Sequence, residues 1–153
     1  MRFVADVMVG KLARWLRIMG YDVLYFNSAE DNFLIYVAKE DDRILLTRDR
    51  RLYSDALRAK AKAFCISSSD TTRQFEEVKE AFSLKARPVA RCALCNFELK
   101  KVSKDEVDGL VPEFVWHRCE VFWRCSGCGK IYWSGTHLKN MVKHMGFDPW
   151  ERE

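Results

Sequence analysis

The first 84 residues alternate between strand-like runs and amphipathic helical segments, and this alternation limits the possible folds more than any other feature of the chain. Runs rich in β-branched and aromatic residues predict strands at residues 2–9, 22–26, 43–47 and 62–67. Apolar residues at helical spacing predict helices at residues 10–20, 31–41, 50–60 and 70–82. The resulting βαβαβαβα order predicts an α/β fold, in which a parallel sheet carries helices on both faces.

Capping residues predict where several of these helices begin and end. Asp31 stands where an N-cap is expected for the second helix. Thr71 and Gln74 have the spacing of a capping box for the fourth helix. Gly20 is placed to end the first helix.

The second part of the chain has a different composition. Five of the six cysteines and four of the five tryptophans follow residue 90, in short segments separated by turns. Pro88 marks the change, and no long linker separates the two parts. We therefore expect two domains, 1–87 and 88–153.

Two Cys-x-x-Cys pairs in this second part have the spacing of a structural zinc site. They place Cys92, Cys95, Cys125 and Cys128 as potential ligands, with 29 residues between the pairs. Each pair can direct two thiolates at one ion from a single turn, and four thiolates suit tetrahedral Zn²⁺. Two alternatives remain: His117 or Cys119 replaces one ligand, or the cysteines are buried or redox-active thiols. We expect a small zinc domain that is held together by the metal.

Composition and charge indicate a folded protein without a membrane segment. Hydrophobic residues make up 48% of the chain, which is enough for a core, and no apolar run approaches the roughly 20 residues that span a bilayer. The N-terminus is too charged for a signal peptide, so a cytoplasmic location is expected. The net charge of +4 permits nucleic-acid binding but does not by itself indicate it.

Three aspartates follow the first three predicted strands. Asp6 lies toward the end of the first strand, Asp31 opens the helix after the second, and Asp49 follows the third. Because the carboxyl ends of parallel strands share one edge of the sheet, these side chains are expected to converge. Convergent carboxylates repel each other unless a cation intervenes, and hard Mg²⁺ or Mn²⁺ suits an oxygen-only site. Such a site can activate water and stabilise a phosphoryl group.

Structural roles compete with this interpretation for each acidic residue. Asp31 and Asp49 can serve as helix caps, whereas Asp6 is costly inside a strand unless it has partners. Other acids near strand ends or turns are Asp22, Asp70 and Glu30. Basic residues that can contact phosphates are Lys11, Arg14, Arg17, Arg48 and Arg50.

Several segments resemble the family named after the C-terminal ribonuclease domain of the Mut-seven exonuclease. These segments read ADVMVGKLARWLRIMGYDVLYF, ILLTRDRRL, CALCN, VSKDEV and FWRCSGCGKIYWSGTH. The resemblance implies a PIN-like nuclease domain followed by a zinc ribbon. It also implies a catalytic site of Asp6, Asp31 and Asp49, the last in the T-x-D turn that PIN domains share. Larger PIN domains usually carry a further acid between the first two positions, and this chain has no clear equivalent.

The ribbon offers residue types that bind nucleic acid. Aromatic residues alternate with basic ones in two stretches, which contain Phe122, Trp123, Tyr132, Trp133, Arg124, Lys130 and Lys139. Aromatic rings can stack on unpaired bases while cations follow phosphates, although about half of these rings must pack around the zinc site. Strand alternation sends Phe122 and Trp123 to opposite faces, so at most one is free. His137 is a further candidate RNA contact.

Together these features predict a Mg²⁺- or Mn²⁺-dependent ribonuclease that cuts within RNA, with Zn²⁺ as a structural ion. Structured RNA, alone or in a ribosome or other ribonucleoprotein, is the expected partner. One alternative is a catalytically weak or inactive module that binds RNA or a ribonucleoprotein. Another is a zinc-stabilised protein-interaction adaptor. No residue pattern reads a 2′-hydroxyl, so the sequence does not distinguish RNA from DNA.

Overall fold

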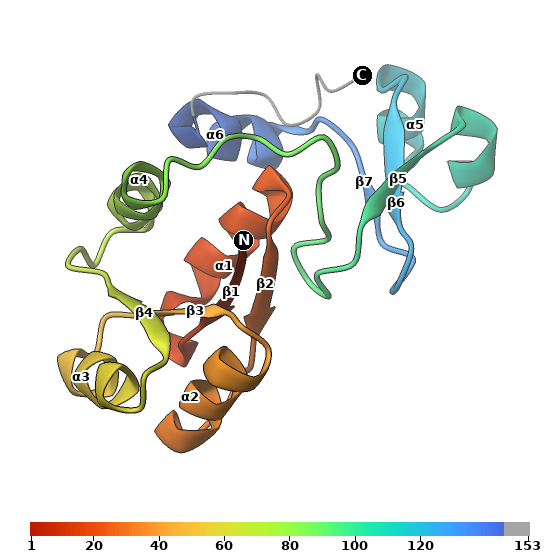
Figure 1. The fold of residues 1–153 in the computed structure, drawn as a ribbon. Coiled ribbons are helices and arrows are strands. Elements are labelled where there is room, and N and C mark those ends of the chain that lie inside the picture. Colours follow the sequence, from red (N-terminus) through yellow and green to blue (C-terminus); the bar gives the residue numbers. More distant parts are fainter. Residues whose placement is uncertain (146–153) are drawn as a thin grey trace.

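A parallel four-stranded sheet forms the centre of the first part of the molecule. The computed structural model describes residues 1–145, apart from the side chains of residues 136, 137, 142 and 144. The strands are β1 (Arg2–Ala5), β2 (Asp22–Tyr25), β3 (Ile44–Thr47) and β4 (Lys62–Cys65). They lie in the order β2-β1-β3-β4, and each neighbouring pair is parallel (Figure 1).

Four helices cover the two faces of this sheet, as the alternation predicts. They are α1 (Gly10–Met19), α2 (Asp31–Glu40), α3 (Arg50–Arg58) and α4 (Thr71–Ala81). The α1 and α4 helices bury Leu16 and Phe75 in one apolar cluster, together with Phe3 of β1. The α2 and α3 helices bury Leu34 and Leu52 in a second cluster on the opposite face (Figure 1). Alternate residues of each strand therefore face two separate cores.

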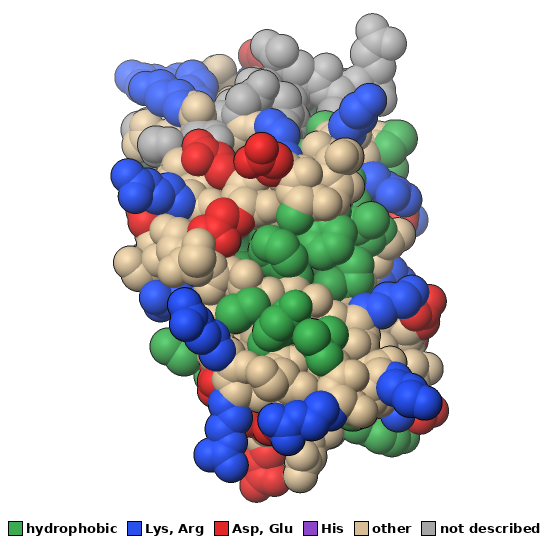
Figure 2. Space-filling view, turned by 60° about the vertical axis from the view of Figure 1, so that its left-hand side comes forward, with side chains coloured by type: hydrophobic (Ala, Val, Ile, Leu, Met, Phe, Trp, Pro, Cys, Tyr) green, Lys and Arg blue, Asp and Glu red, His purple; other side chains and the backbone are tan. Residues whose placement is uncertain are grey.

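The β4 strand forms one edge of the sheet. Its residues Ala63, Phe64 and Cys65 are half-buried, whereas Lys62 is exposed. Hydrophobic side chains gather near the centre of this face of the molecule, with acidic and basic side chains around them (Figure 2). A short strand with a charged residue limits edge-to-edge pairing, which is a common protection of sheet edges.

The first strand is shorter than predicted. The β1 strand ends at Ala5, and Val7–Val9 forms a 3₁₀ turn, η1, before α1. The Asp6 amide donates to the Leu46 carbonyl at 2.9 Å, and the Val9 amide then donates to the Asp6 carbonyl at 3.0 Å. Asp6 is therefore the last residue that pairs with β3, and the chain turns immediately after it.

Two of the predicted N-caps are one residue away from the observed ones. Glu30 is the N-cap of α2, and Asp31 is already helical. Asp70 is the N-cap of α4, and its carboxylate accepts from the Arg73 amide, so Thr71 cannot form the predicted capping box. Asp is a stronger N-cap than Thr, which explains the change at α4; the same preference does not explain Glu30 at α2. Gly20 ends α1 as predicted, in the left-handed region with φ of 107°.

The second part of the chain contains a three-stranded antiparallel sheet. Its strands are β5 (Leu99–Val102), β6 (Phe122–Cys125) and β7 (Ile131–Tyr132), in the order β5-β6-β7. Between β5 and β6 lie η2 (Lys104–Val107) and α5 (Glu113–Arg118), and α6 (Thr136–Met145) follows β7. A small apolar core contains Val107, Val115 and Phe122. The α6 helix returns to α4, where Lys79 Nζ donates to the Met145 carbonyl at 3.1 Å (Figure 1).

Apolar packing is continuous between the two parts. Cys92, Leu99, Cys125 and Tyr132 belong to the same buried cluster as residues of β1 and α1. The division at residues 87 and 88 remains a prediction, and the structure adds that the second part shares its largest core with the first. In the described part of the chain, no helix is long and apolar enough to cross a membrane.

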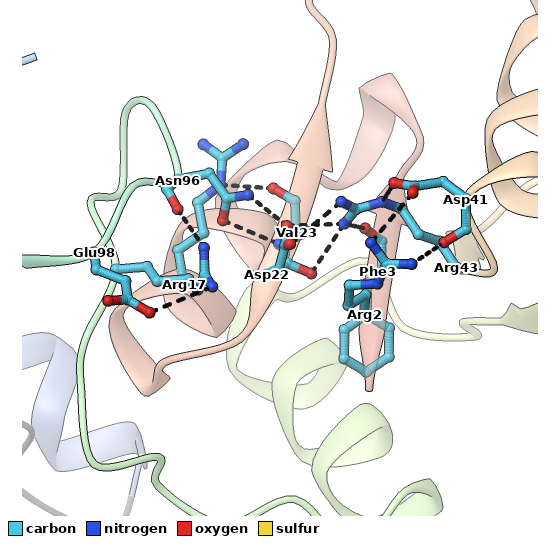
Figure 3. Close-up of polar contacts among 10 residues, drawn as sticks. Arg2, Phe3, Arg17, Asp22, Val23, Asp41, Arg43, Asn96 and Glu98 are labelled. Atoms are coloured by element: carbon cyan, nitrogen blue, oxygen red, sulfur yellow. Dashed lines mark hydrogen bonds and ion pairs between the residues drawn. The ribbon is translucent and has the colours of Figure 1, made fainter. Parts of the chain in front are cut away.

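A buried guanidinium joins the two parts at the end of α1. Arg17 Nε donates to the Val23 carbonyl at 2.8 Å, and Arg17 Nη1 donates to the carbonyls of Ala93 at 2.8 Å and Leu94 at 3.3 Å. Asn96 makes the matching contact, since its Oδ1 accepts from the Val23 amide at 3.0 Å (Figure 3). The prediction that Arg17 contacts phosphates is therefore wrong, because backbone carbonyls occupy this side chain.

Asp22 belongs to the same polar junction. Its carboxylate accepts from Asn96 Nδ2 at 2.6 Å and pairs with Arg43 Nη1 at 2.8 Å (Figure 3). Burial opposes its ionisation, but the hydrogen bonds from Arg43 and Asn96 prevail and lower the pKa of Asp22. Asp22 begins β2, so it lies at the amino edge of the sheet and does not serve as a fourth acid beside the other aspartates.

Replacing Arg17 by Lys should lower the free energy of unfolding by about 3 kcal/mol, because an ammonium cannot reach the carbonyls of both parts and leaves buried acceptors without donors. Urea unfolding of the zinc-loaded protein measures the change. Arg14→Lys, an exposed change on the same helix, should shift the midpoint by much less. Equal shifts for the two variants would contradict this role of Arg17.

Candidate functional site

The order of the strands creates a reversal point between β1 and β3. The chain passes from β1 to β2 on one side and then to β3 on the other side of β1. Asp6 follows β1 directly, and Asp49 follows β3 by two residues, so both lie at the carboxyl edge beside this point. Ligands of open α/β sheets bind at such positions.

Thr47 connects the two aspartates. Its hydroxyl donates to Asp6 Oδ2 at 2.8 Å and accepts from the Asp49 amide at 2.9 Å. Thr47 is fully buried and Asp6 is only 6% exposed, so the bridge is shielded from water. The hydroxyl supplies the partner that a buried carboxylate needs. Sequence reasoning treated Thr47 only as part of the T-x-D turn and did not assign it this bridging role.

Asp49 also caps α3. Its Oδ1 accepts from the amides of Arg51 at 2.9 Å and Leu52 at 3.2 Å. The helix-capping role, which the sequence offers as an alternative for Asp49, is therefore present. Within the described residues both capping bonds reach Oδ1, which leaves Oδ2 for a ligand. Capping holds the carboxylate in one orientation and does not exclude a second function.

The charges of the other aspartates affect the ionisation of Asp31. It is exposed and lies in the first turn of α2. Partial desolvation, followed by the negative charges of Asp49, Asp6 and Asp55, raises the pKa of the Asp31 carboxyl above its ordinary value. The effect shows that the three predicted residues share one region of negative potential. Asp55 of α3 adds to this region, and sequence reasoning missed it because it lies inside a helix, away from any strand end.

The aspartates offer oxygen ligands of the kind that Mg²⁺ and Mn²⁺ prefer. Partial desolvation and then repulsion from the other carboxylates raise the pKa of Asp31, and a divalent cation would relieve the repulsion. The chemistry of these donors therefore suits such a cation. The arrangement is more open than that of the cysteines, which among the described residues form the only comparably tight group of three or more potential ligands.

The basic residues predicted to contact phosphates fall into separate groups. Lys11 is exposed in the first turn of α1, and Arg50 is exposed at the start of α3. Arg48 is half-buried, and its Nε is buried without a hydrogen-bond partner among the described residues. Arg14 instead lines a cavity that also contacts the second part. The side chain of His137 lies outside the described residues, so this prediction has no structural counterpart.

The four predicted zinc ligands converge. Their sulfur atoms all lie within 4.8 Å of one another, with Cys92 and Cys128 at 3.8 Å and Cys95 and Cys125 at 3.2 Å. A tetrahedral zinc ion with Zn–S bonds of about 2.3 Å separates its sulfurs by about 3.8 Å. The donor set and its size therefore fit a Zn²⁺ ion with no open coordination position.

Backbone amides support the second cysteine pair. The amides of Gly127 and Cys128 donate to Cys125 Sγ at 3.3 and 3.4 Å. Burial opposes ionisation, but these hydrogen bonds and the neighbouring Cys95 thiol lower the pKa of Cys125 to about 7. Gly127 is needed here, because a Cβ at this position would lie 2.6 Å from the Phe97 ring. Thiolate formation at neutral pH favours metal binding.

The alternative ligands lie elsewhere. Cys119 packs against the small core around Phe122, and His117 Nε2 faces Glu113 at 3.7 Å. Neither belongs to the group of converging sulfurs. The set of four cysteines is the one that the structure supports.

Comparison with known proteins gives one family. The family model described as Mut7-C RNAse domain matches residues 1–145. No curated protein and no solved structure matches the chain.

Replacing Asp31 by Asn should raise thermal stability at neutral pH. A carboxyl whose pKa is higher in the folded protein destabilises it as the pH rises above the ordinary value of 3.8, because the folded protein gives up the proton less readily. Melting temperatures at about pH 7 and about pH 3 test this, because the difference should vanish once both states are protonated.

Glu113→Gln is the matched control for Asp31→Asn. Glu113 also opens a helix, but its described neighbours include the histidine His117 at 3.7 Å. Its removal should leave stability unchanged or lower it slightly at neutral pH. A decrease for Asp31→Asn as well would contradict the inference that the charge of Asp31 destabilises the folded protein.

Replacing Cys95 by Ser should abolish stoichiometric zinc binding and lower the free energy of unfolding by about 4 kcal/mol or more, because loss of a structural metal also frees the buried residues around it. Zinc content and calorimetric unfolding are the measurements. Cys65→Ser should keep the zinc, since Cys65 lies in β4 outside the group of four cysteines. Full zinc retention in Cys95→Ser would exclude Cys95 as a ligand.

Proposed function

Because the chain belongs to the Mut7-C RNAse domain family, we propose that it is a Mg²⁺- or Mn²⁺-dependent ribonuclease that hydrolyses phosphodiester bonds within RNA. Membership of the family supports a nuclease or RNA-related function for the chain. The metal dependence and the endonucleolytic mode are proposals that rest on the site. The division into a PIN-like domain and a zinc ribbon belongs to the same proposal.

The bridge from Asp6 through Thr47 to Asp49 is the observation that carries the proposal. It presents two carboxylates at the reversal point of a parallel sheet, with a third at Asp31. A bound divalent cation would lower the pKa of water and stabilise charge on the phosphoryl group. The aspartates would hold this cation, and Thr47 would keep Asp6 and Asp49 in a fixed relation to each other.

Basic side chains around the edge would bind the scissile region of RNA. Arg48 follows β3 directly and is half-buried at the carboxyl edge of the sheet, where a guanidinium can pair with phosphate oxygens. Lys11 and Arg50 are exposed at the starts of α1 and α3, the helices that follow Asp6 and Asp49 in sequence. These cations would orient the phosphate and add to the salt dependence of binding.

The ribbon would contribute to RNA binding through only some of its aromatic residues. Phe122 is fully buried, as the alternation of the strand predicts, and Trp123 is half-buried on the other face. Tyr132 is buried, and its hydroxyl lies 3.1 Å from Cys92 Sγ. Trp133 is half-buried and lines a cavity together with exposed Lys130, so it is better placed for a ligand than Phe122 and Tyr132.

A second function, RNA or ribonucleoprotein binding without cleavage, is favoured by one observation. The aspartates form a more open arrangement than the cysteines, and Asp49 has a structural role as a cap. A protein that keeps the acidic edge for folding alone would show the same caps. Metal-dependent cleavage separates the two functions.

Replacing Asp49 by Asn should reduce RNA cleavage in Mn²⁺ by about a hundredfold or more, because it removes a ligand charge. Asn is as good an N-cap as Asp, so α3 should remain intact. Cleavage of a mixed pool of structured RNA measures the effect, with equal zinc content in both proteins. Asp70→Asn is the matched control, since Asp70 caps α4 at the same edge of the sheet.

The outcomes separate the proposals. Cleavage by the parent and by Asp70→Asn, but not by Asp49→Asn, supports a catalytic cation at Asp49. Equal cleavage by all three proteins would place the chemistry elsewhere. RNA binding without cleavage by any of them would favour the binding function.

A further inference from the structure

A cavity lies between the first helix and the second part of the chain, apart from the aspartates. Its volume is about 340 Å³, and its walls come from α1, the first cysteine turn, β7 and α6. Ile18, Leu94 and Leu138 contribute apolar surface to it. Binding sites for small organic groups are commonly of this size and character.

Trp133 is the aromatic surface of this cavity. A Cβ on Gly135 would lie only 3.0 Å from Trp133 Nε1, so the glycine allows the indole to occupy its position. The neighbouring Tyr132 is less available, because Lys130 Nζ lies 5.2 Å from the centre of its ring and its hydroxyl contacts Cys92. A planar group that enters the cavity would therefore stack on Trp133.

The charged lining residues are both cations. Arg14 and Lys130 are exposed, and no carboxylate lines the cavity among the described residues. An apolar cavity with an indole and two cations matches a planar base attached to a phosphate. Its volume suits one nucleotide, whereas paired bases inside a helix cannot enter it.

Basic residues lead from the cavity toward the aspartates. Lys11 and Arg14 are three residues apart on α1, which places them on neighbouring positions of one helix face about 4.5 Å apart along its axis. Lys11 lies near the start of α1, which follows Asp6 after the short turn η1. A strand of RNA along this face would connect the cavity with the carboxyl edge of the sheet.

We propose that the cavity binds one unpaired nucleotide of RNA, with its base stacked on Trp133 and its phosphates near Arg14 and Lys130. This inference rests on the proposed ribonuclease function and adds a substrate preference to it. An unpaired nucleotide held here positions the flanking RNA at the aspartates. The protein therefore selects RNA with a loop, bulge or single-stranded end a few nucleotides from the bond that is cut.

The test uses an RNA hairpin with a single 2-aminopurine in its loop, bound to the zinc-loaded full chain that carries Asp49→Asn so that the RNA remains intact. Stacking on an aromatic side chain should quench the 2-aminopurine fluorescence in a saturable titration. The same 2-aminopurine placed in a paired stem is the control probe and should show little quenching. Equal quenching in the two positions would overturn the proposal.

Variants then assign the binding to the cavity. Arg14→Ala together with Lys130→Ala should weaken binding of the loop probe at least about tenfold relative to Lys100→Ala with Lys101→Ala, which removes the same charge from exposed positions of β5. Trp133→Leu should reduce the quenching and weaken binding about tenfold through loss of stacking. Both cation pairs are exposed, so the comparison remains valid even if Trp133→Leu does not fold.

Cleavage assays with an active Asp49 distinguish a failure of this inference from a failure of the proposed function. If the parent cleaves RNA in Mn²⁺ and the cavity variants bind and cleave as well as the Lys100 and Lys101 variant, the nucleotide site is wrong and the ribonuclease function stands. If no protein cleaves but the cavity variants lose affinity for the loop probe, the nucleotide site stands and the ribonuclease function fails.

Discussion

The buried guanidinium of Arg17 is the contact on which the arrangement of the whole molecule depends. It donates to the carbonyl of Val23 in the first sheet and to the carbonyls of Ala93 and Leu94 in the first cysteine turn. Burial lowers the pKa of Arg17 despite the nearby thiols, but an arginine remains charged. A charge in this place is tolerated only because carbonyl oxygens surround it. The sheet and the metal-binding turn are therefore held in one relative position.

The two candidate metal centres differ in the kind of ligand that they offer. The cysteines supply four soft ligands at distances that close a tetrahedron, so their role is structural. The aspartates supply hard ligands in a looser group, and desolvation together with the charges of its neighbours raises the pKa of Asp31. The hydroxyl of Thr47 supplies a hydrogen bond to the buried carboxylate of Asp6 and at the same time fixes the turn that carries Asp49.

Much of the candidate site could be predicted because it depends on local sequence. Aspartates that follow strands must reach the carboxyl edge when the strands are parallel, and Cys-x-x-Cys turns bring thiolates together whatever surrounds them. Arg17 was assigned to phosphates because a basic residue on an amphipathic helix is usually solvated, and nothing local shows that a distant turn covers it. Asp55 was missed for the same kind of reason, since its proximity to Asp31 depends on how α2 and α3 lie against one face of the sheet.

The sequence by itself determined the α/β alternation, the four sulfur ligands and the edge on which the aspartates lie, because these depend on periodicity and on spacings of a few residues. Only the tertiary structure decided that Thr47 bridges Asp6 and Asp49, that Arg17 binds the cysteine turn, and that α1, β7 and α6 enclose a cavity beside Trp133. These features join residues that are about 40 to 120 positions apart in the chain. Their distances are set by the packing of whole elements around a shared core, which no local pattern records.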